Sequence, residues 1–406
     1  MICIIGLSTE KYRMIFMTVA LNRELRKFVA PEFITGDNSR IFAGRYALNF
    51  HSKKIFLATD KNIPDQFWMD AVTDSFLDAG IDYEIFTDIS ENPHDSEVMK
   101  GAGVYEAEEC TAIVAVGGGS VMDCAKGIGI IAANGGEITD YIGVDLVKNP
   151  MPPLICIPTT GGSSADVSQY AVISTPANKK KNLITSKSLV PDVSLLDPVP
   201  LTTQPDKVTV YSGIDAFSHA IEAYLSNGSS HWSDLMALEA IKNIGDAFPY
   251  DESLKGDLDF RFKTLLSSLY AGISFSNAGL GLIHSMSHAI GGMYSLPHGL
   301  SSSLVMPFAV RYNFSSAPLR YRNAAEALFI DTAGKSDEMV LELLIEKISE
   351  MGGLYTKGLT LKSLGGTEDD IPVLVKNTLT DPCIATNPRF PDVKEIEELY
   401  IEAFGD

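Results

Sequence analysis

The chain has 406 residues, of which 45% are hydrophobic and 21% are charged. This composition is that of a globular protein, and the length exceeds what one simple core usually holds, so we expect two domains. The formal net charge of −20 argues against binding to the phosphate backbone of nucleic acids.

The five cysteines predict core thiols. Their number is odd and no two are spaced as Cys-x-x-Cys, so neither a disulfide framework nor a cysteine zinc site is expected. Cys110 and Cys156 adjoin or lie within apolar runs, and we expect both to be buried. Unpaired thiols indicate a reducing compartment, which favours the cytoplasm.

Residues 1–32 are interpreted as an irregular N-terminal extension. An apolar stretch around Met14 follows Lys11 and Arg13, as in a secretory signal peptide, but no small-residue cleavage site comes after it. The sequence leaves open whether the native chain starts at Met1, Met14 or Met17. Because no uninterrupted apolar run is long enough to cross a bilayer, we expect no membrane association.

Residues 33–199 alternate short apolar runs with helical patterns. We expect buried strands over 54–59, 82–87, 112–116 and 154–157, with helices over 66–79 and 95–109 among them. Strands that alternate with helices predict a mainly parallel sheet with helices on both faces.

Residues 200–406 have a different residue pattern, which is mainly helical. Beyond Leu195-Leu196-Asp197-Pro198 the strand signals nearly vanish, and we expect long helices over 206–226, 232–244, 261–274, 279–293 and 339–351. We therefore place a domain boundary near residue 200 and predict an all-helical second domain.

A glycine-rich loop follows the predicted strand 112–116. The run Gly117-Gly118-Gly119-Ser120 opens a helical pattern, and its glycines allow a pyrophosphate to approach the backbone closely. The start of the helix adds free N–H groups and a partial positive charge. A plain strand-to-helix turn also explains such a cluster when it is taken alone.

Two further strand ends carry residues that suit a dinucleotide. Asp60 follows strand 54–59, where a carboxylate can bind a ribose 2′-hydroxyl and repel a 2′-phosphate, so NAD is favoured over NADP. The run Pro158-Thr159-Thr160-Gly161-Gly162-Ser163-Ser164 follows strand 154–157 and suits ligand binding at the carboxyl end of a sheet. Taken singly, Asp60 is also explained as a turn residue and the run as a flexible loop. Asp60 precedes the glycine loop, so the unit is not a standard GxGxxG fingerprint.

Histidines and one aspartate recur at helical spacing in the second half. Asp215 and His219 lie four apart, and His284 and His288 repeat that spacing, so each pair shares one helix face. His298 follows at a predicted turn. Carboxylate and imidazole ligands suit iron or zinc. A single pair is commonly an accident of the helix face, but two pairs and a third position favour a metal site.

These motifs together resemble the iron-containing (group III) alcohol dehydrogenases, from about Phe33 to the C-terminus. The resemblance is carried by Gly117-Gly118-Gly119-Ser120 with Asp123 and Lys126, Pro158-Thr159-Thr160, Gly213-Ile214-Asp215-Ala216 with His219, His284 with His288, Pro297-His298-Gly299, and Asp381-Pro382-Cys383 with Thr386-Asn387-Pro388-Arg389.

The resemblance implies a dehydroquinate synthase-like fold with the site in the cleft between an α/β and a helical domain, and a homodimer or higher homo-oligomer. It implies a divalent metal, iron first with zinc or manganese as alternatives, whose ligands are Asp215, His219, His284 and His298. It implies that NAD is contacted by Asp60, Gly118, Gly119, Ser120, Thr159, Thr160 and Lys181. His288 would be the catalytic proton carrier beside the metal and the nicotinamide.

The implied reaction is direct hydride transfer between the nicotinamide and a small alcohol or aldehyde whose oxygen the metal polarises. One departure from the family pattern is Asp166, where such proteins usually carry Glu, so contacts of Ser163 or Asp166 with ligands are in doubt. A glycerol-dehydrogenase-like polyol oxidoreductase and a dehydroquinate-synthase-like lyase are the alternatives. A lyase acting on a sugar phosphate should have basic residues near the metal, and residues 272–307 contain no Lys or Arg. A non-catalytic metal- or nucleotide-binding protein is a third alternative.

Overall fold

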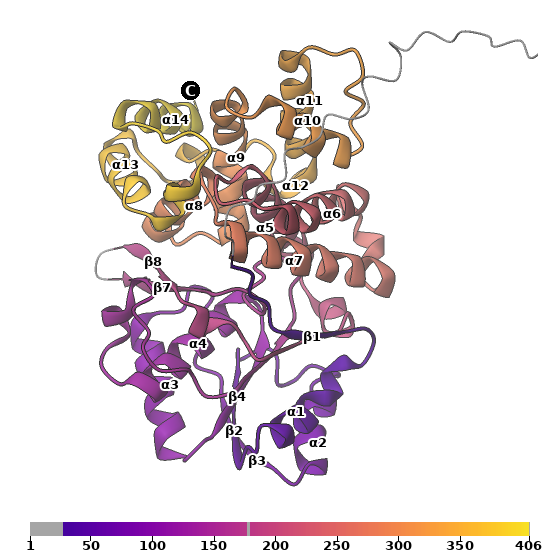
Figure 1. Cartoon of the computed structure of the whole chain (residues 1–406), viewed down its shortest axis with the longest axis vertical. Helices are drawn as coiled ribbons and strands as arrows, with labels where there is room; N and C mark the ends of the chain where they lie inside the picture. Colours follow the sequence, from indigo (N-terminus) through magenta and orange to yellow (C-terminus); the bar gives the residue numbers. More distant parts are fainter. Residues whose placement is uncertain (1–26, 177–178, 406) are drawn as a thin grey trace, which may run out of the picture.

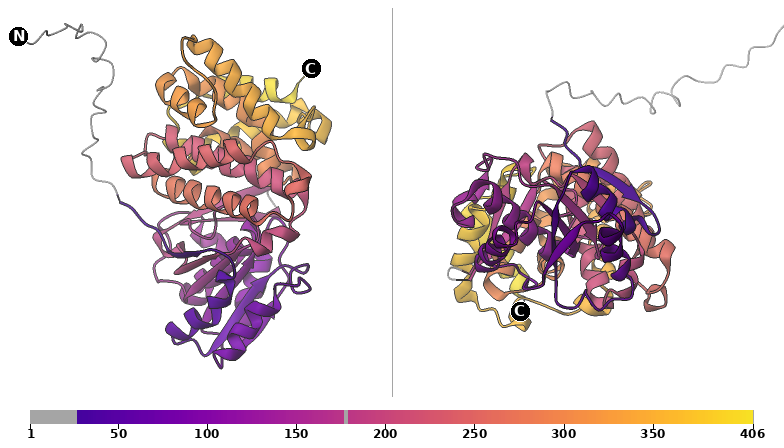
Figure 2. Two further views of the ribbon diagram at one scale, coloured as in Figure 1. Left: turned by 90° about the vertical axis from the view of Figure 1, so that its right-hand side faces the viewer. Right: turned by 90° about the horizontal axis from the view of Figure 1, so that it is seen from below.

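A computed structural model of the protein describes residues 27–176 and 179–405. The signal-like stretch, Met14, Met17 and most of the predicted extension 1–32 lie outside these residues. Two layers of different construction follow one another along the molecule, a sheet with flanking helices and then a stack of helices (Figures 1 and 2). The predicted fold class, an α/β part followed by a helical part, is confirmed.

The first part is built on a six-stranded, wholly parallel sheet in the order β1-β9-β6-β4-β2-β3. Its strands are β1 (Glu32–Thr35), β2 (Lys54–Thr59), β3 (Asp82–Phe86), β4 (Ala112–Gly117), β6 (Leu154–Pro158) and β9 (Val193–Leu196). The four predicted strands are β2, β3, β4 and β6, with ends that differ by at most one residue.

Alternating side chains bury both faces of this sheet. Ile55 and Leu57 of β2 pack towards α1 (Ala43–Asn49) and α2 (Asp70–Asp78). Phe56 and Ala58 face α3 (Asp95–Ala107) and α4 (Gly119–Asn134). Burial on both faces is why the central strands are continuous apolar runs in the sequence.

A second, three-stranded sheet was not predicted. It has the order β5-β8-β7 and consists of β5 (Gly143–Val144), β7 (Tyr170–Thr175) and β8 (Lys180–Thr185), with β7 antiparallel to β8. The polar run at the start of β8 hides its strand signal. This sheet contacts α4 through β7 and α8 through β8, so it lies where the two parts of the chain meet.

Helices form the second part of the chain. They are α5 (Asp206–Leu225), α6 (His231–Ala247), α7 (Leu258–Ala278), α8 (Leu282–Tyr294), α9 (His298–Phe314), α10 (Pro318–Ala327), α11 (Asp337–Met351), α12 (Gly353–Thr356), α13 (Ile371–Leu379) and α14 (Val393–Phe404). Short 3-10 helices connect elements of both parts, at η1 (Ser39–Phe42), η2 (Ile138–Tyr141), η4 (Lys187–Leu189), η5 (Val199–Thr203), η6 (Glu252–Leu254), η7 (Lys362–Leu364), η8 (Glu368–Asp370) and η9 (Pro382–Thr386).

Helix α5 lies at the centre of this helical part. It packs against α6, α7 and α9, and from Gly213 to its last residue it is buried. Helix α8 packs against α9 and α13 and against strand β8. Helices α5 and α8, which carry three of the four predicted metal ligands, are therefore held on several sides.

The four cysteines within the described ranges are buried and unpaired, as predicted for Cys110 and Cys156. In the same ranges, no helix is long and apolar enough to cross a membrane.

Candidate active site

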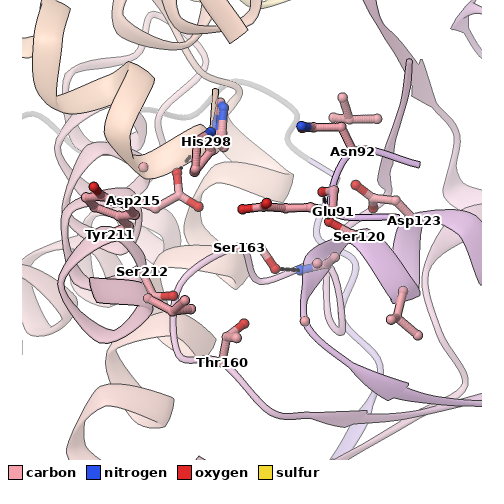
Figure 3. Close-up of a pocket in the computed structure, with 18 of the residues that line it drawn as sticks. Glu91, Asn92, Ser120, Asp123, Thr160, Ser163, Tyr211, Ser212, Asp215 and His298 are labelled. Carbon is pink, nitrogen blue, oxygen red and sulfur yellow. Dashed lines mark hydrogen bonds and ion pairs between the residues drawn. The ribbon is translucent and has the colours of Figure 1, made fainter. Parts of the chain in front are cut away.

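A cavity of about 920 Å³ lies between the two parts of the chain, and Figure 3 shows part of its lining. Its walls come from the loops after β2, β4 and β6 and from α5, α8 and α9. Every residue predicted for the site lines this cavity, namely Asp60, Gly118, Gly119, Ser120, Thr159, Thr160, Lys181, Asp215, His219, His284, His288 and His298. Residues spread over most of the chain thus meet at one place, at the carboxyl ends of parallel strands.

The glycine loop is closely covered by the loop after β6. A Cβ at Gly118 would lie 3.3 Å from the Thr160 side chain, and one at Gly119 would lie 2.6 Å from the Ser163 side chain. Gly118 caps α4, whose first turn faces the cavity. Larger residues would fill the space in which an anionic group can reach the free N–H groups of this turn.

Asp60 and Lys181 lie in other parts of the same wall. Asp60 directly follows β2, and one of its carboxylate oxygens accepts a hydrogen bond from the Asn62 amide at 2.8 Å. Burial lowers the pKa of Lys181 to about 8, although the nearby carboxylates, Asp215 first among them, favour its charged form. Glu91 extends into the cavity between Asp123 and Asp215 (Figure 3).

Four side chains converge at the helical end of the cavity. Asp215 and His219 come from α5, His284 from α8, and His298 is the first residue of α9. One potential ligand atom from each residue lies within 4.8 Å of the others. The rings of His219 and His284 stack with centroids 4.5 Å apart, and His298 Nε2 is 3.5 Å from Asp215 Oδ1.

These four groups fit a divalent cation. Among the described residues, Asp215 Oδ1, His219 Nδ1 and His284 Nε2 are buried and have no hydrogen-bond partner. Burial raises the pKa of Asp215 to about 7 and lowers the pKa of all three histidines well below the usual value. The imidazoles are therefore neutral and can donate lone pairs, and an ion would remove the cost of unpaired buried polar atoms.

His288 lies beside this group with a different partner. Its Nδ1 is 2.8 Å from Asp381 Oδ2, and its ring stacks on His298 with centroids 5.2 Å apart. The other oxygen of Asp381 accepts the Cys383 amide at 2.9 Å. Burial opposes ionisation of Asp381, but His288 and the Cys383 groups outweigh it and lower the pKa of this carboxyl.

Sequence reasoning missed Glu222 and gave Asp381 no role. Glu222 is 4% exposed, and its Oε2 lies 2.7 Å from His284 Nδ1. A signal for Glu222 existed, because it follows His219 by three positions and Asp215 by seven and so shares their helix face. No spacing in the sequence connects Asp381 with His288.

Two residues of the family motifs lie away from the cavity. Asp166 is buried and accepts a hydrogen bond from Ser194 Oγ at 2.7 Å, whereas its neighbour Ser163 lines the cavity. Lys126 is buried and donates to the carbonyl oxygens of Ser168 and Tyr170 at 2.8 and 2.7 Å. Both hold loops in place instead of facing a ligand.

Models of one protein family match both parts of the chain. An iron-containing alcohol dehydrogenase model matches residues 30–198, and a model of the C-terminal part of the Fe-containing alcohol dehydrogenase family matches residues 209–404. The fold and the family models define the class, an oxidoreductase of the alcohol dehydrogenase type. The chain belongs to the iron-containing alcohol dehydrogenase family, as its motifs predicted.

Individual relatives agree over almost the whole length. An NAD-dependent methanol dehydrogenase of Bacillus methanolicus is 34% identical over 93% of this chain and 99% of its own length. A 1,3-propanediol dehydrogenase of Citrobacter freundii is 35% identical over 91% of this chain and 96% of its own. The crystal structure of a 1,3-propanediol oxidoreductase superimposes with a TM-score of 0.89 at 32% identity, covering 94% of this chain and 100% of that one.

Proposed function

We propose that this protein is a metal-dependent alcohol dehydrogenase that transfers a hydride between NAD(H) and a small alcohol or aldehyde. The observation that carries the proposal is the cavity in which a glycine loop opening a helix faces four side chains that can hold a metal ion, three of them buried. The family membership of the chain supports the same reaction class.

Asp215, His219, His284 and His298 would hold the metal, with iron favoured by the family and zinc or manganese as alternatives. When bound, such an ion supplies Lewis-acid polarisation of an alcohol or carbonyl oxygen. The protein's own contribution is to keep the three imidazoles neutral through burial and to hold them on helices that cannot separate easily.

NAD would bind along the rest of the cavity. The amides at the start of α4 suit its pyrophosphate, and the loop carrying Thr159 and Thr160 covers that position. Asp60 lies at the strand end where its carboxylate would repel a 2′-phosphate, which supports NAD over NADP. The name of the methanol dehydrogenase relative, which is NAD-dependent, supports the same choice.

His288 is the residue we assign to proton transfer. It lines the cavity next to the four metal-binding side chains but is engaged by Asp381 through Nδ1. Its Nε2 is therefore the ring nitrogen that can exchange a proton with substrate. A substrate bound in this cavity would lie within reach of the His288 ring, and the walls from the two parts of the chain would limit its contact with water.

The proposal is tested by His284→Ala, which removes one of the four donors. We expect loss of most bound metal and of NADH-dependent reduction of a panel of aldehydes, measured on protein reconstituted separately with Fe²⁺, Zn²⁺ and Mn²⁺. The substitution Glu239→Gln, at an exposed position of α6, is the control for losses of metal or activity that arise during purification and reconstitution. Stoichiometric metal and normal turnover in His284→Ala would refute the site, and no turnover of any aldehyde by the unmodified protein would refute the reaction.

The proposal also covers the location of the protein, its oligomeric state and its division into domains. We propose that the protein is cytoplasmic, and the buried free thiols support this location. We propose a homodimer or higher homo-oligomer. We also propose a division into an extension (1–32), an α/β dinucleotide-binding domain (33–199) and a helical metal-binding domain (200–406), which the limits of the two family models support.

A further inference from the structure

Two buried carboxylates contact the two histidines of α8, one turn apart. Glu222 lies 2.7 Å from His284 Nδ1, and Asp381 lies 2.8 Å from His288 Nδ1. Both carboxylates are almost fully buried, at 4% and 5% exposure. The contacts are alike in chemistry, yet the two imidazoles face different surroundings.

The carboxylate of Glu222 is held by its own helix, α5, and by backbone amides at the start of α8. It comes from α5, and its oxygens accept the amides of Gly281, Ile283 and His284 at 2.9, 2.5 and 3.3 Å. It therefore satisfies the free N–H groups at the start of α8 and ties this helix to α5. These two helices supply three of the four metal-binding side chains.

The same carboxylate determines which nitrogen of His284 is free. When Glu222 is ionised, it accepts the proton on Nδ1 and leaves the lone pair of His284 on Nε2. His284 Nε2 is buried and, among the described residues, has no partner. The ring is thereby aimed as a ligand, and it is the Glu222 contact that fixes its tautomer.

Asp381 imposes the same tautomer on His288 but for another purpose. It belongs to the segment after α13, and its second oxygen is occupied by the Cys383 amide, so the carboxylate cannot rotate freely. His288 lines the cavity outside the four-membered metal-binding group. Its Nε2 lone pair is left for a substrate proton, and the imidazolium that forms would be stabilised by the adjacent carboxylate.

We infer that Glu222 and Asp381 are positioning residues that give the two histidines of α8 different tasks, Glu222 by aiming His284 at the metal and Asp381 by orienting His288 for proton transfer. This inference rests on the proposed function. It assigns to each carboxylate an effect on a different measurable quantity, the affinity for metal or the pH dependence of turnover.

The first test compares Fe²⁺ affinity in metal-free proteins, titrated anaerobically against a colorimetric chelator. Glu222→Gln should weaken Fe²⁺ binding by about 10–100-fold, because the amide cannot accept all the N–H groups around it. Asp381→Asn should bind Fe²⁺ as the unmodified protein does. Unchanged affinity in Glu222→Gln, or a comparable loss in Asp381→Asn, overturns the division of tasks.

The second test measures turnover against pH with saturating metal. Asp381→Asn should lower kcat by roughly 10–100-fold and move the pH profile, since the amide can favour the wrong tautomer of His288. In the His288→Ala background the same substitution should have almost no further effect, because Asp381 acts through that ring. If the fold losses in kcat of the two single variants multiply in the double variant, the two residues act independently and the inference is overturned.

Control variants distinguish the expected changes in Fe²⁺ affinity and turnover from misfolding and from failure of the proposed function. Glu239→Gln and Asp369→Asn are exposed substitutions of the same chemistry and should change neither quantity. If Glu222→Gln does not fold, Glu222→Asp replaces it; the shorter carboxylate withdraws from His284, and Fe²⁺ affinity equal to that of the unmodified protein then overturns the inference. Full metal retention by His284→Ala would instead refute the metal site itself.

Discussion

Metal binding should release protons from two carboxyls of this site. Burial raises the pKa of Asp215 to about 7 and that of Glu222 to about 8 in the absence of an ion. Both exceed the usual carboxyl values, so both groups hold a proton at pH 6. Asp215 must lose its proton to act as a ligand, and Glu222 must become ionised to accept the Nδ1 proton of His284 and leave Nε2 free for a cation. The imidazoles of the three proposed histidine ligands contribute no proton at pH 6, because burial keeps their pKa well below the usual value.

The magnitude follows from this count. Below about pH 7 we expect release of about two protons per ion, so that the apparent affinity falls by about 100-fold for each pH unit, or about 2.7 kcal/mol. Above about pH 8 both carboxyls are ionised and the dependence should flatten. Raised pKa values thus favour metal binding at higher pH and oppose it on acidification.

Isothermal titration of metal-free protein with Zn²⁺, in buffers of different ionisation enthalpy at pH 6 and pH 8.5, measures this release directly. Glu222→Gln should release about one proton at pH 6, since Asp215 alone remains to titrate. Release of three or more protons by the unmodified protein would show that the histidines are charged before binding. A pH-independent affinity between pH 5.5 and 7 would refute the raised carboxyl pKa values.

Three further predictions concern other parts of the site. His288→Ala should keep stoichiometric metal but lose turnover by about 10²–10⁴-fold with a changed pH profile, and loss of metal would make His288 a ligand. Asp60→Gly should narrow the preference for NAD over NADP by roughly 10-fold in steady-state kinetics, and a preference for NADP in the unmodified enzyme would contradict this. A Cβ at Gly299 would lie 2.0 Å from the Tyr211 carbonyl oxygen, so Gly299→Ala should lower the free energy of unfolding by about 1–3 kcal/mol and weaken metal binding. The open position Gly103 provides the control, where Ala should leave chemical denaturation unchanged or stabilise the protein.

Local patterns in the sequence determined the central sheet and much of the site. The apolar runs of β2, β4 and β6 identify buried parallel strands, because both faces of such strands are covered. The spacing of Asp215 and His219, and of His284 and His288, places each pair on one helix face, which is a property of the helix itself. The glycine loop is likewise local, since strand, loop and helix follow directly in the chain.

Tertiary structure alone decided which elements meet. β1 pairs with β9, and the β7–β8 hairpin lies against α4 and α8, although neither contact has a signal in the spacing of residues. Asp381 contacts His288 from a segment that lies far along the chain. Glu222 of α5 contacts His284 of α8, a different helix. Periodicity specifies the face of one element but not its partner, which depends on how side chains pack between elements. For that reason the sequence indicated the histidines of the candidate site, whereas the carboxylates that contact two of them, Glu222 and Asp381, became visible only in the folded chain.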